Sequence, residues 1–83
     1  MERYECLLTN RFKRSFRKLP SEVKERVLAA IEELTNNPFL GHFITTLGVW
    51  SFRVGDYRVL YDIDREKREI ILLTVRHRRR AYC

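Results

Sequence analysis

Apolar residues recur at helical spacing near the start of the chain. Phe12, Phe16 and Leu19 stand at positions i, i+4 and i+7, which places them on one face of a helix. Thr9 or the residue after it can supply the N-cap, and Pro20 ends the helix because it cannot continue one. The pattern therefore predicts one short amphipathic helix.

A second apolar stripe follows at once. It begins after Ser21 and closes at the TNNP sequence of residues 35–38, which combines helix-ending and turn-forming residues. The stripe and its flank contain Val23, Val27, Leu28, Ala30, Ile31 and Leu34. Because Pro20 alone separates the two helical patterns, the two helices are expected to form a hairpin.

The rest of the chain alternates apolar and polar residues with a period of two, which is typical of half-buried strands. A Gly-Asp turn at residues 55–56 and a charged turn at residues 64–68 divide this part into three strands. The sequence RYECLLT suits a first strand, and residues 39–48 form a connector with no clear period. The predicted strands cover residues 3–9, 49–54, 57–63 and 69–76.

The resulting order, β-α-α-β-β-β, predicts an α+β fold in which the helical hairpin covers one face of a mostly antiparallel sheet. With 83 residues the chain is expected to be a single domain over residues 1–83. A domain of this size buries only about 60% of its unfolded surface, so most of its apolar residues are needed for the core.

The Gly-Asp turn sets the register of the central hairpin, since Gly favours the first position of a two-residue turn. In that register Arg53 lies directly opposite Arg58. Alternation then assigns these residues to the face that meets the helices: Trp50, Phe52, Val54, Tyr57, Val59, Tyr61 and Ile63. The open face receives Ser51, Arg53, Arg58, Leu60 and Asp62. On the last strand we expect Ile71, Leu73 and Val75 in the core, with Thr74, Arg76 and Arg78 on the open face.

Composition excludes several classes of protein. The longest apolar stretches are far shorter than the roughly 20 residues of a membrane span, and the N-terminus carries charges where a signal peptide has its apolar run. A cytoplasmic protein with no membrane partner is therefore expected. The two cysteines have no metal-binding spacing, and motifs for metal, phosphate-loop or Ser-His-Asp chemistry are missing, so no metal and no cofactor are expected.

The formal net charge of +6 is concentrated at the two ends of the chain. Residues 1–20 carry six basic and two acidic side chains, and residues 50–83 carry nine basic and five acidic ones. Such an excess indicates a polyanionic or acidic partner. Like charges directly opposite each other destabilise a sheet, so a bound phosphate explains Arg53 and Arg58 better than a merely solvated face does.

The closing sequence VRHRRRAYC adds groups that could perform chemistry. His77 belongs to the residue type that exchanges protons near neutral pH, and Tyr82 offers a ring for stacking on a base. Each has a plainer interpretation, as a surface donor and as a ring packed on the sheet edge. RNA carries its own nucleophile, the 2′-hydroxyl, so its cleavage needs a base, an acid and cations around the phosphate. The basic residues that we expect to bind phosphate are Arg53, Arg58, Arg76, Arg78, Arg79 and Arg80.

Three segments of the chain together resemble the RelE/ParE toxins of toxin–antitoxin pairs. They are RSFRKLPSEVKERV, LGVWSFRVGDYRVLYDID and VRHRRRAY, and they extend over nearly the whole sequence. The resemblance implies a small RelE-like ribonuclease that enters the ribosomal A site and cuts mRNA there. It also implies a cognate acidic, RelB-like antitoxin that wraps around the toxin in a heteromeric complex.

The resemblance also implies roles for individual residues. The arginine at position 58 stabilises the phosphate, Arg78 acts as acid or charge stabiliser, and Tyr82 orients or stacks the RNA. Ser51 and Arg53 stand where bacterial RelE has lysines that act as base, and an arginine is a poor base because the pKa of a guanidinium exceeds about 12. His77 is therefore our first candidate for the base and Tyr82 the second.

Two other functions remain open at this point. A ParE-like toxin would poison DNA gyrase without any catalysis, with the basic tail as a docking surface for protein. A toxin homologue that has lost its activity is the other alternative. We favour the nuclease, because binding to gyrase requires neither a proton acceptor nor a stacking ring.

Overall fold

The computed structural model of the protein describes residues 3–80, with two helices packed against a five-stranded sheet in that part of the chain. The elements, in order, are β1 (Glu5–Leu8), α1 (Asn10–Arg17), α2 (Ser21–Asn36), the 3-10 helix η1 (Pro38–Leu40), β2 (His42–Ile44), β3 (Val49–Val54), β4 (Tyr57–Asp64), β5 (Glu69–His77) and the 3-10 helix η2 (Arg78–Arg80). The strand order is β1-β5-β4-β3-β2, with β1 parallel to β5 and every other pair antiparallel.

The first helix begins where the sequence pattern indicates. The Thr9 hydroxyl accepts a hydrogen bond from the backbone N–H of Phe12 at 3.1 Å and donates one to the carbonyl of Leu72 at 2.8 Å. One side chain therefore caps α1 and attaches it to β5. Phe12, which follows the cap, is only 1% exposed and anchors the helix in the core.

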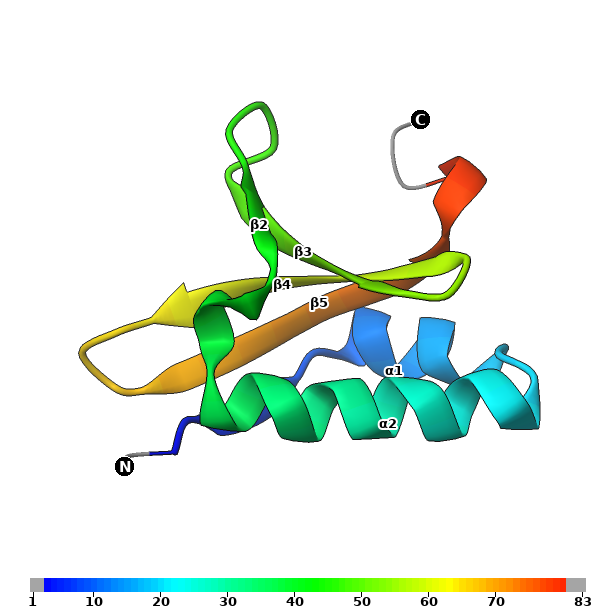
Figure 1. The fold of residues 1–83 in the computed structure, drawn as a ribbon, viewed down its shortest axis with the longest axis horizontal. Helices are drawn as coiled ribbons and strands as arrows, with labels where there is room; N and C mark the ends of the chain where they lie inside the picture. Colours follow the sequence, from blue (N-terminus) through cyan, green and yellow to red (C-terminus); the bar gives the residue numbers. More distant parts are fainter. Residues whose placement is uncertain (1–2, 81–83) are drawn as a thin grey trace.

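Both helices lie on the same face of the sheet and leave the opposite face open (Figure 1). The core between the layers is formed by Phe12, Leu19, Val27, Ala30, Leu34, Val54, Val59, Tyr61, Ile70, Leu72 and Val75. On the open side, the β2–β3 end of the sheet rises at one end and η2 rises at the other (Figure 1). The predicted α+β architecture, with a helical hairpin on one face of a mostly antiparallel sheet, is confirmed.

The register of the central hairpin is also confirmed. Val54 pairs with Tyr57 and Arg53 pairs with Arg58 across the Gly55-Asp56 turn. Gly55 has a φ of +59°, the left-handed conformation that the first residue of this turn requires and that glycine adopts without strain.

The residues of β5 that face the core differ in part from those predicted. Ile70, Leu72 and Val75 are buried in the core, whereas Ile71 and Leu73 are only partly buried. The pairing of Leu60 with Thr74 is followed by that of Tyr61 with Leu72, so Leu73 is an extra residue in a β-bulge. Our assignment of Ile71 and Leu73 to the core was therefore wrong, because the bulge changes the face of β5 between Leu72 and Val75.

A short strand was also missed. β2 lies within the connector of residues 39–48 and pairs with β3 at the edge of the sheet. It is held there by Tyr61, which is fully buried and whose hydroxyl donates to the carbonyl of Pro38 at 2.8 Å and accepts from the N–H of Gly41 at 3.2 Å. The element order is therefore β-α-α-β-β-β-β.

Candidate functional site

Three arginines lie side by side on the open face of the sheet. Arg58 on β4 pairs with Arg53 on β3 and with Arg76 on β5, and directly paired residues present their side chains on the same face. We call Arg53, Arg58 and Arg76 the arginine row. Arg53 is exposed, and the other two are half-buried. The row therefore presents charge to solvent while the side chains of Arg58 and Arg76 are partly enclosed by their neighbours.

A second set of paired residues forms the floor beside the arginine row. Ser51, Leu60 and Thr74 lie next to one another across β3, β4 and β5, and all three are buried. The guanidinium of Arg58 extends toward this floor, where its Nη1 donates to the Ser51 hydroxyl at 3.4 Å. Arg53 instead donates from Nε to the carbonyl of Gly55 at 3.0 Å. The first two arginines of the row are thus oriented by their own hairpin.

The basic segment after β5 is attached to the tip of the same hairpin. The backbone N–H of Arg78 donates to the carbonyl of Asp56 at 2.6 Å, which turns the chain from β5 into η2. The side chains of Arg78 and Arg79 are exposed. The side chains of Arg80 and Tyr82, which the sequence also assigns to the site, lie outside the described residues.

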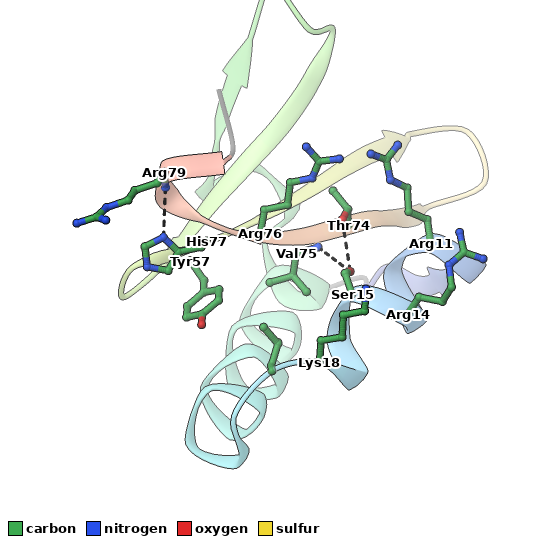
Figure 2. Close-up of a pocket in the computed structure, with 11 residues that line it drawn as sticks. Arg11, Arg14, Ser15, Lys18, Tyr57, Thr74, Val75, Arg76, His77 and Arg79 are labelled. Atoms are coloured by element: carbon green, nitrogen blue, oxygen red, sulfur yellow. Dashed lines mark hydrogen bonds between the residues drawn. The ribbon is translucent and has the colours of Figure 1, made fainter. Parts of the chain in front are cut away.

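His77 does not share the open face with the arginine row. It pairs with Tyr57, one residue beyond the pairing of Arg58 with Arg76, so its side chain lies on the face that bears the helices. Its ring contacts Tyr57 edge-on at 5.2 Å between centroids, and Nδ1 accepts from the N–H of Arg79 at 3.3 Å. Figure 2 shows His77 and Tyr57 on the opposite side of β5 from Arg76. The expected cluster of His77 with the open-face arginines is corrected accordingly.

The helical side of β5 contributes basic residues that the sequence did not assign to the site. Beyond Leu72 the edge of β5 is no longer paired with β1, and the Ser15 hydroxyl of α1 accepts from the N–H of Val75 at 3.1 Å. A groove of about 810 Å³ runs along this junction (Figure 2). Its charged lining comes from Arg11, Arg14, Lys18, Arg76, His77 and Arg79. The basic excess of residues 1–20 was the signal that could have indicated the first three.

The chemistry available at the open face is therefore that of cations and hydroxyls. Guanidinium groups donate paired hydrogen bonds to phosphate oxygens and keep their charge at any physiological pH. Within residues 3–80, no group of three or more His, Cys, Asp or Glu side chains lies close enough together to bind a metal ion. The arrangement suits a phosphate diester whose charge increases during a reaction.

The family model described as the ParE toxin of the type II toxin–antitoxin system parDE matches residues 6–82. The chain belongs to this toxin family. The matched range contains both helices, the three strands that bear the arginine row and the start of the basic segment after β5.

Solved structures extend the likeness of this toxin to RelE proteins. A chain of the toxin–antitoxin complex RelBE2 from Mycobacterium tuberculosis is 32% identical, with a TM-score of 0.83 over 92% of this chain and 99% of that one. The archaeal RelE–RelB complex from Pyrococcus horikoshii is 24% identical, with a TM-score of 0.77 over 94% and 98% of the two chains. A mutant of Escherichia coli RelE in the free state is 19% identical, with a TM-score of 0.82 over 96% and 88%. The last two show the shared fold alone.

Two further findings concern curated sequences and the length of the helices. No curated protein sequence matches the toxin. Among its described residues, neither helix combines the length and apolar character that crossing a membrane would require.

Proposed function

We propose that this toxin is a ribosome-dependent endoribonuclease that cleaves mRNA in the A site and so inhibits translation. The arginine row is the observation that carries the proposal. Three guanidinium groups on adjacent strands of an open face provide a site for one phosphate. Without a bound anion, their mutual repulsion destabilises the folded protein. The RelE-like fold supports the same reaction class.

The cleavage we propose uses the RNA's own nucleophile. A base takes the proton of the 2′-hydroxyl, the 2′-oxygen forms a bond to phosphorus, and the bond from phosphorus to the 5′-oxygen breaks. The departing 5′-oxygen takes a proton from an acid or from water, which leaves a 2′,3′-cyclic phosphate and a 5′-hydroxyl. Arg53, Arg58 and Arg76 stabilise the charge that accumulates on the phosphate, and Arg78 approaches from η2 as a further charge stabiliser.

The proposed partner in the cell is an acidic, RelB-like antitoxin that covers the open face. The 32% identical chain comes from a toxin–antitoxin complex, and the net charge of +6 favours an acidic partner. Such a complex would keep the toxin inactive in the cytoplasm, where its ribosome and mRNA targets are. A separate acidic protein bound to the arginine row would compete with RNA for the same guanidinium groups.

The test is mRNA cleavage on translating ribosomes by purified toxin. We expect Arg58→Ala and Arg78→Ala to lower the cleavage rate, for Arg58→Ala by about 10²–10³-fold, the usual loss when one charge-stabilising group is removed. Arg17→Ala is the matched control, since it removes one exposed positive charge from the end of α1, outside the site. Equal cleavage by Arg58→Ala and Arg17→Ala would contradict the role of the arginine row.

The second candidate function is a ParE-like poison of DNA gyrase, which the description of the matched family favours. The same purified toxin can be tested for inhibition of DNA supercoiling by gyrase. Gyrase inhibition without mRNA cleavage would replace the nuclease proposal with this alternative. Cleavage without gyrase inhibition would support the nuclease.

A further inference from the structure

His42 is the histidine that the structure places on the same face as the arginine row. It lies on β2 and pairs directly with Ser51 of β3, so the two side chains share a face. Ser51 shares that face with Arg53, two residues further along β3, because alternate residues of a strand point to the same side. The side chain of His42 is exposed, whereas that of Ser51 is only 1% exposed.

The position of His42 is fixed by the residues just before it. The hydroxyl of Tyr61 binds both the carbonyl of Pro38 and the N–H of Gly41, so the chain reaches β2 along a defined path. A Cβ on Gly41 would lie 2.6 Å from the Ser51 carbonyl oxygen and 2.6 Å from the Tyr61 hydroxyl. Glycine at this position therefore permits the close approach that brings His42 beside Ser51.

Ser51 lies between the imidazole and the nearest arginine. Arg58 reaches the Ser51 hydroxyl from β4, and His42 adjoins Ser51 from β2, with about 4.5–5.5 Å between the Cβ atoms of a directly opposed pair. An anion bound by Arg58 above Ser51 would thus have His42 at its side. The nearby charged groups that share this face are Arg53, Arg58 and Asp62 on β3 and β4, and Arg76 on β5.

We propose that His42 accepts the proton of the RNA 2′-hydroxyl in the reaction described above. The inference rests on the proposed nuclease function and names a residue for its first step. The 2′-hydroxyl proton passes to a ring nitrogen of the neutral imidazole, while the 2′-oxygen attacks the phosphorus bound by Arg58. The imidazolium then returns its proton to solvent after the 5′-oxygen has departed with a proton of its own. His77 fits this step less well, since its side chain lies on the opposite face of β5 from Arg76 and the rest of the arginine row (Figure 2).

The experiment measures single-turnover mRNA cleavage on translating ribosomes by the parent, His42→Gln, His42→Ala and His77→Gln proteins. We expect His42→Gln to lower the rate by about 10²–10⁴-fold, the usual contribution of a positioned proton-transfer group. The loss should be larger than in His77→Gln. Imidazole added to the buffer should restore part of the activity of His42→Ala. The parent rate should rise with pH over the range in which histidines titrate, and the His42→Gln rate should lose that dependence.

The outcomes separate this inference from the proposed function. A parent protein that does not cleave mRNA would overturn both. A parent that cleaves, together with a His42→Gln protein that cleaves at the same rate, would overturn the role of His42 and leave the nuclease standing. A slow His42→Gln protein that keeps the parent's pH dependence, with no rescue of His42→Ala by imidazole, would also overturn proton transfer by His42. Thermal unfolding of each variant establishes that it is folded.

Discussion

Removing charge from an end of the arginine row should stabilise the free toxin. Arg76 has one row neighbour, Arg58, directly opposite it on the adjacent strand. Like charges in such a pair destabilise a sheet, and cross-strand pairs contribute roughly 0.2–1 kcal/mol each. We therefore expect Arg76→Gln to raise the free energy of unfolding at low salt by about 0.2–1 kcal/mol.

The structure also predicts how the three positions differ. Arg53 also has one neighbour in the row, but Arg53→Gln loses the hydrogen bond from Nε to the Gly55 carbonyl at 3.0 Å, so its gain should be smaller than that of Arg76→Gln. Arg58 has two neighbours, and its removal relieves about 0.4–2 kcal/mol of repulsion. It also removes the hydrogen bond to Ser51, which contributes about 0.5–1.5 kcal/mol for an ordinary bond and less at 3.4 Å. Arg58→Gln should therefore gain less stability than the relief of repulsion alone would give.

The assay is urea unfolding of the isolated toxin at several salt concentrations, because urea adds no charge. A gain of 1 kcal/mol corresponds to an increase of about 4–8 °C in Tm for a domain of this size, so thermal unfolding can follow the same variants. Arg76→Lys is the matched control, since it keeps the positive charge and should show no gain. Added sulfate should stabilise the parent more than Arg76→Gln, because an anion that binds only the folded protein shifts the unfolding equilibrium.

Salt dependence decides whether the reasoning is correct. The Debye length is about 10 Å at 0.1 M salt and 3 Å at 1 M, so the advantage of Arg76→Gln should fall as the salt concentration rises. An Arg76→Gln protein that is less stable than the parent at every salt concentration would show that the row is a structural feature of the fold. The explanation of the row as a phosphate site would then be refuted.

Two further predictions concern the attachment of β2. Burial raises the pKa of Tyr61 to about 12, and the hydrogen bond from Gly41 opposes this effect more weakly. Because the folded protein holds the phenolic proton more tightly, the free energy of unfolding should fall as the pH rises from the ordinary value of 10.0 to about 12. In Tyr61→Phe this part of the decline with pH should disappear. Urea unfolding below pH 10 should also show a loss of about 1–3 kcal/mol, because the Pro38 carbonyl and the Gly41 N–H lose their partner. A Tyr61→Phe protein whose stability falls with pH as steeply as the parent's would contradict the raised pKa of Tyr61. Gly41→Ala should destabilise the protein by about 1–3 kcal/mol, because the added methyl group would overlap the backbone oxygen of Ser51. A variant that is as stable as the parent in urea unfolding would show that β2 can move away from β3.

Much of the fold could be predicted from the sequence because local signals agree with the final structure. Thr9 and Ser21 mark the starts of the two helices, and the Gly-Asp turn fixes the register that forms the Arg53–Arg58 pair. These features depend on residues within one turn of each other. The arginine row follows from them once Arg76 is placed on the adjacent strand.

The orientation of residues 70–73 and the position of His42 depend on features that local patterns do not contain. Residues 70–73 are all apolar, so alternation does not show which of them face the core. The bulge at Leu73 therefore cannot be recognised from the sequence. β2 has only three residues, and it is positioned by the hydroxyl of Tyr61, about twenty residues away in the sequence. The bulge decides which of residues 70–73 face the core, and the tether places His42 on the face of the arginines; neither was predicted.

The tether at Tyr61 also gives the protein an internal fluorescent reporter. Trp50, the single tryptophan in the sequence, stacks on Tyr61 at 6.2 Å between ring centroids and contacts Phe43 of β2 edge-on at 5.7 Å. It pairs with Phe43 next to the pair that joins His42 to Ser51, and its ring lies on the opposite face of the sheet. Any shift of β2 when RNA or an antitoxin occupies the open face would change the surroundings of this indole. The emission of the unlabelled toxin can therefore report movement of the His42 strand without any probe on the binding surface itself.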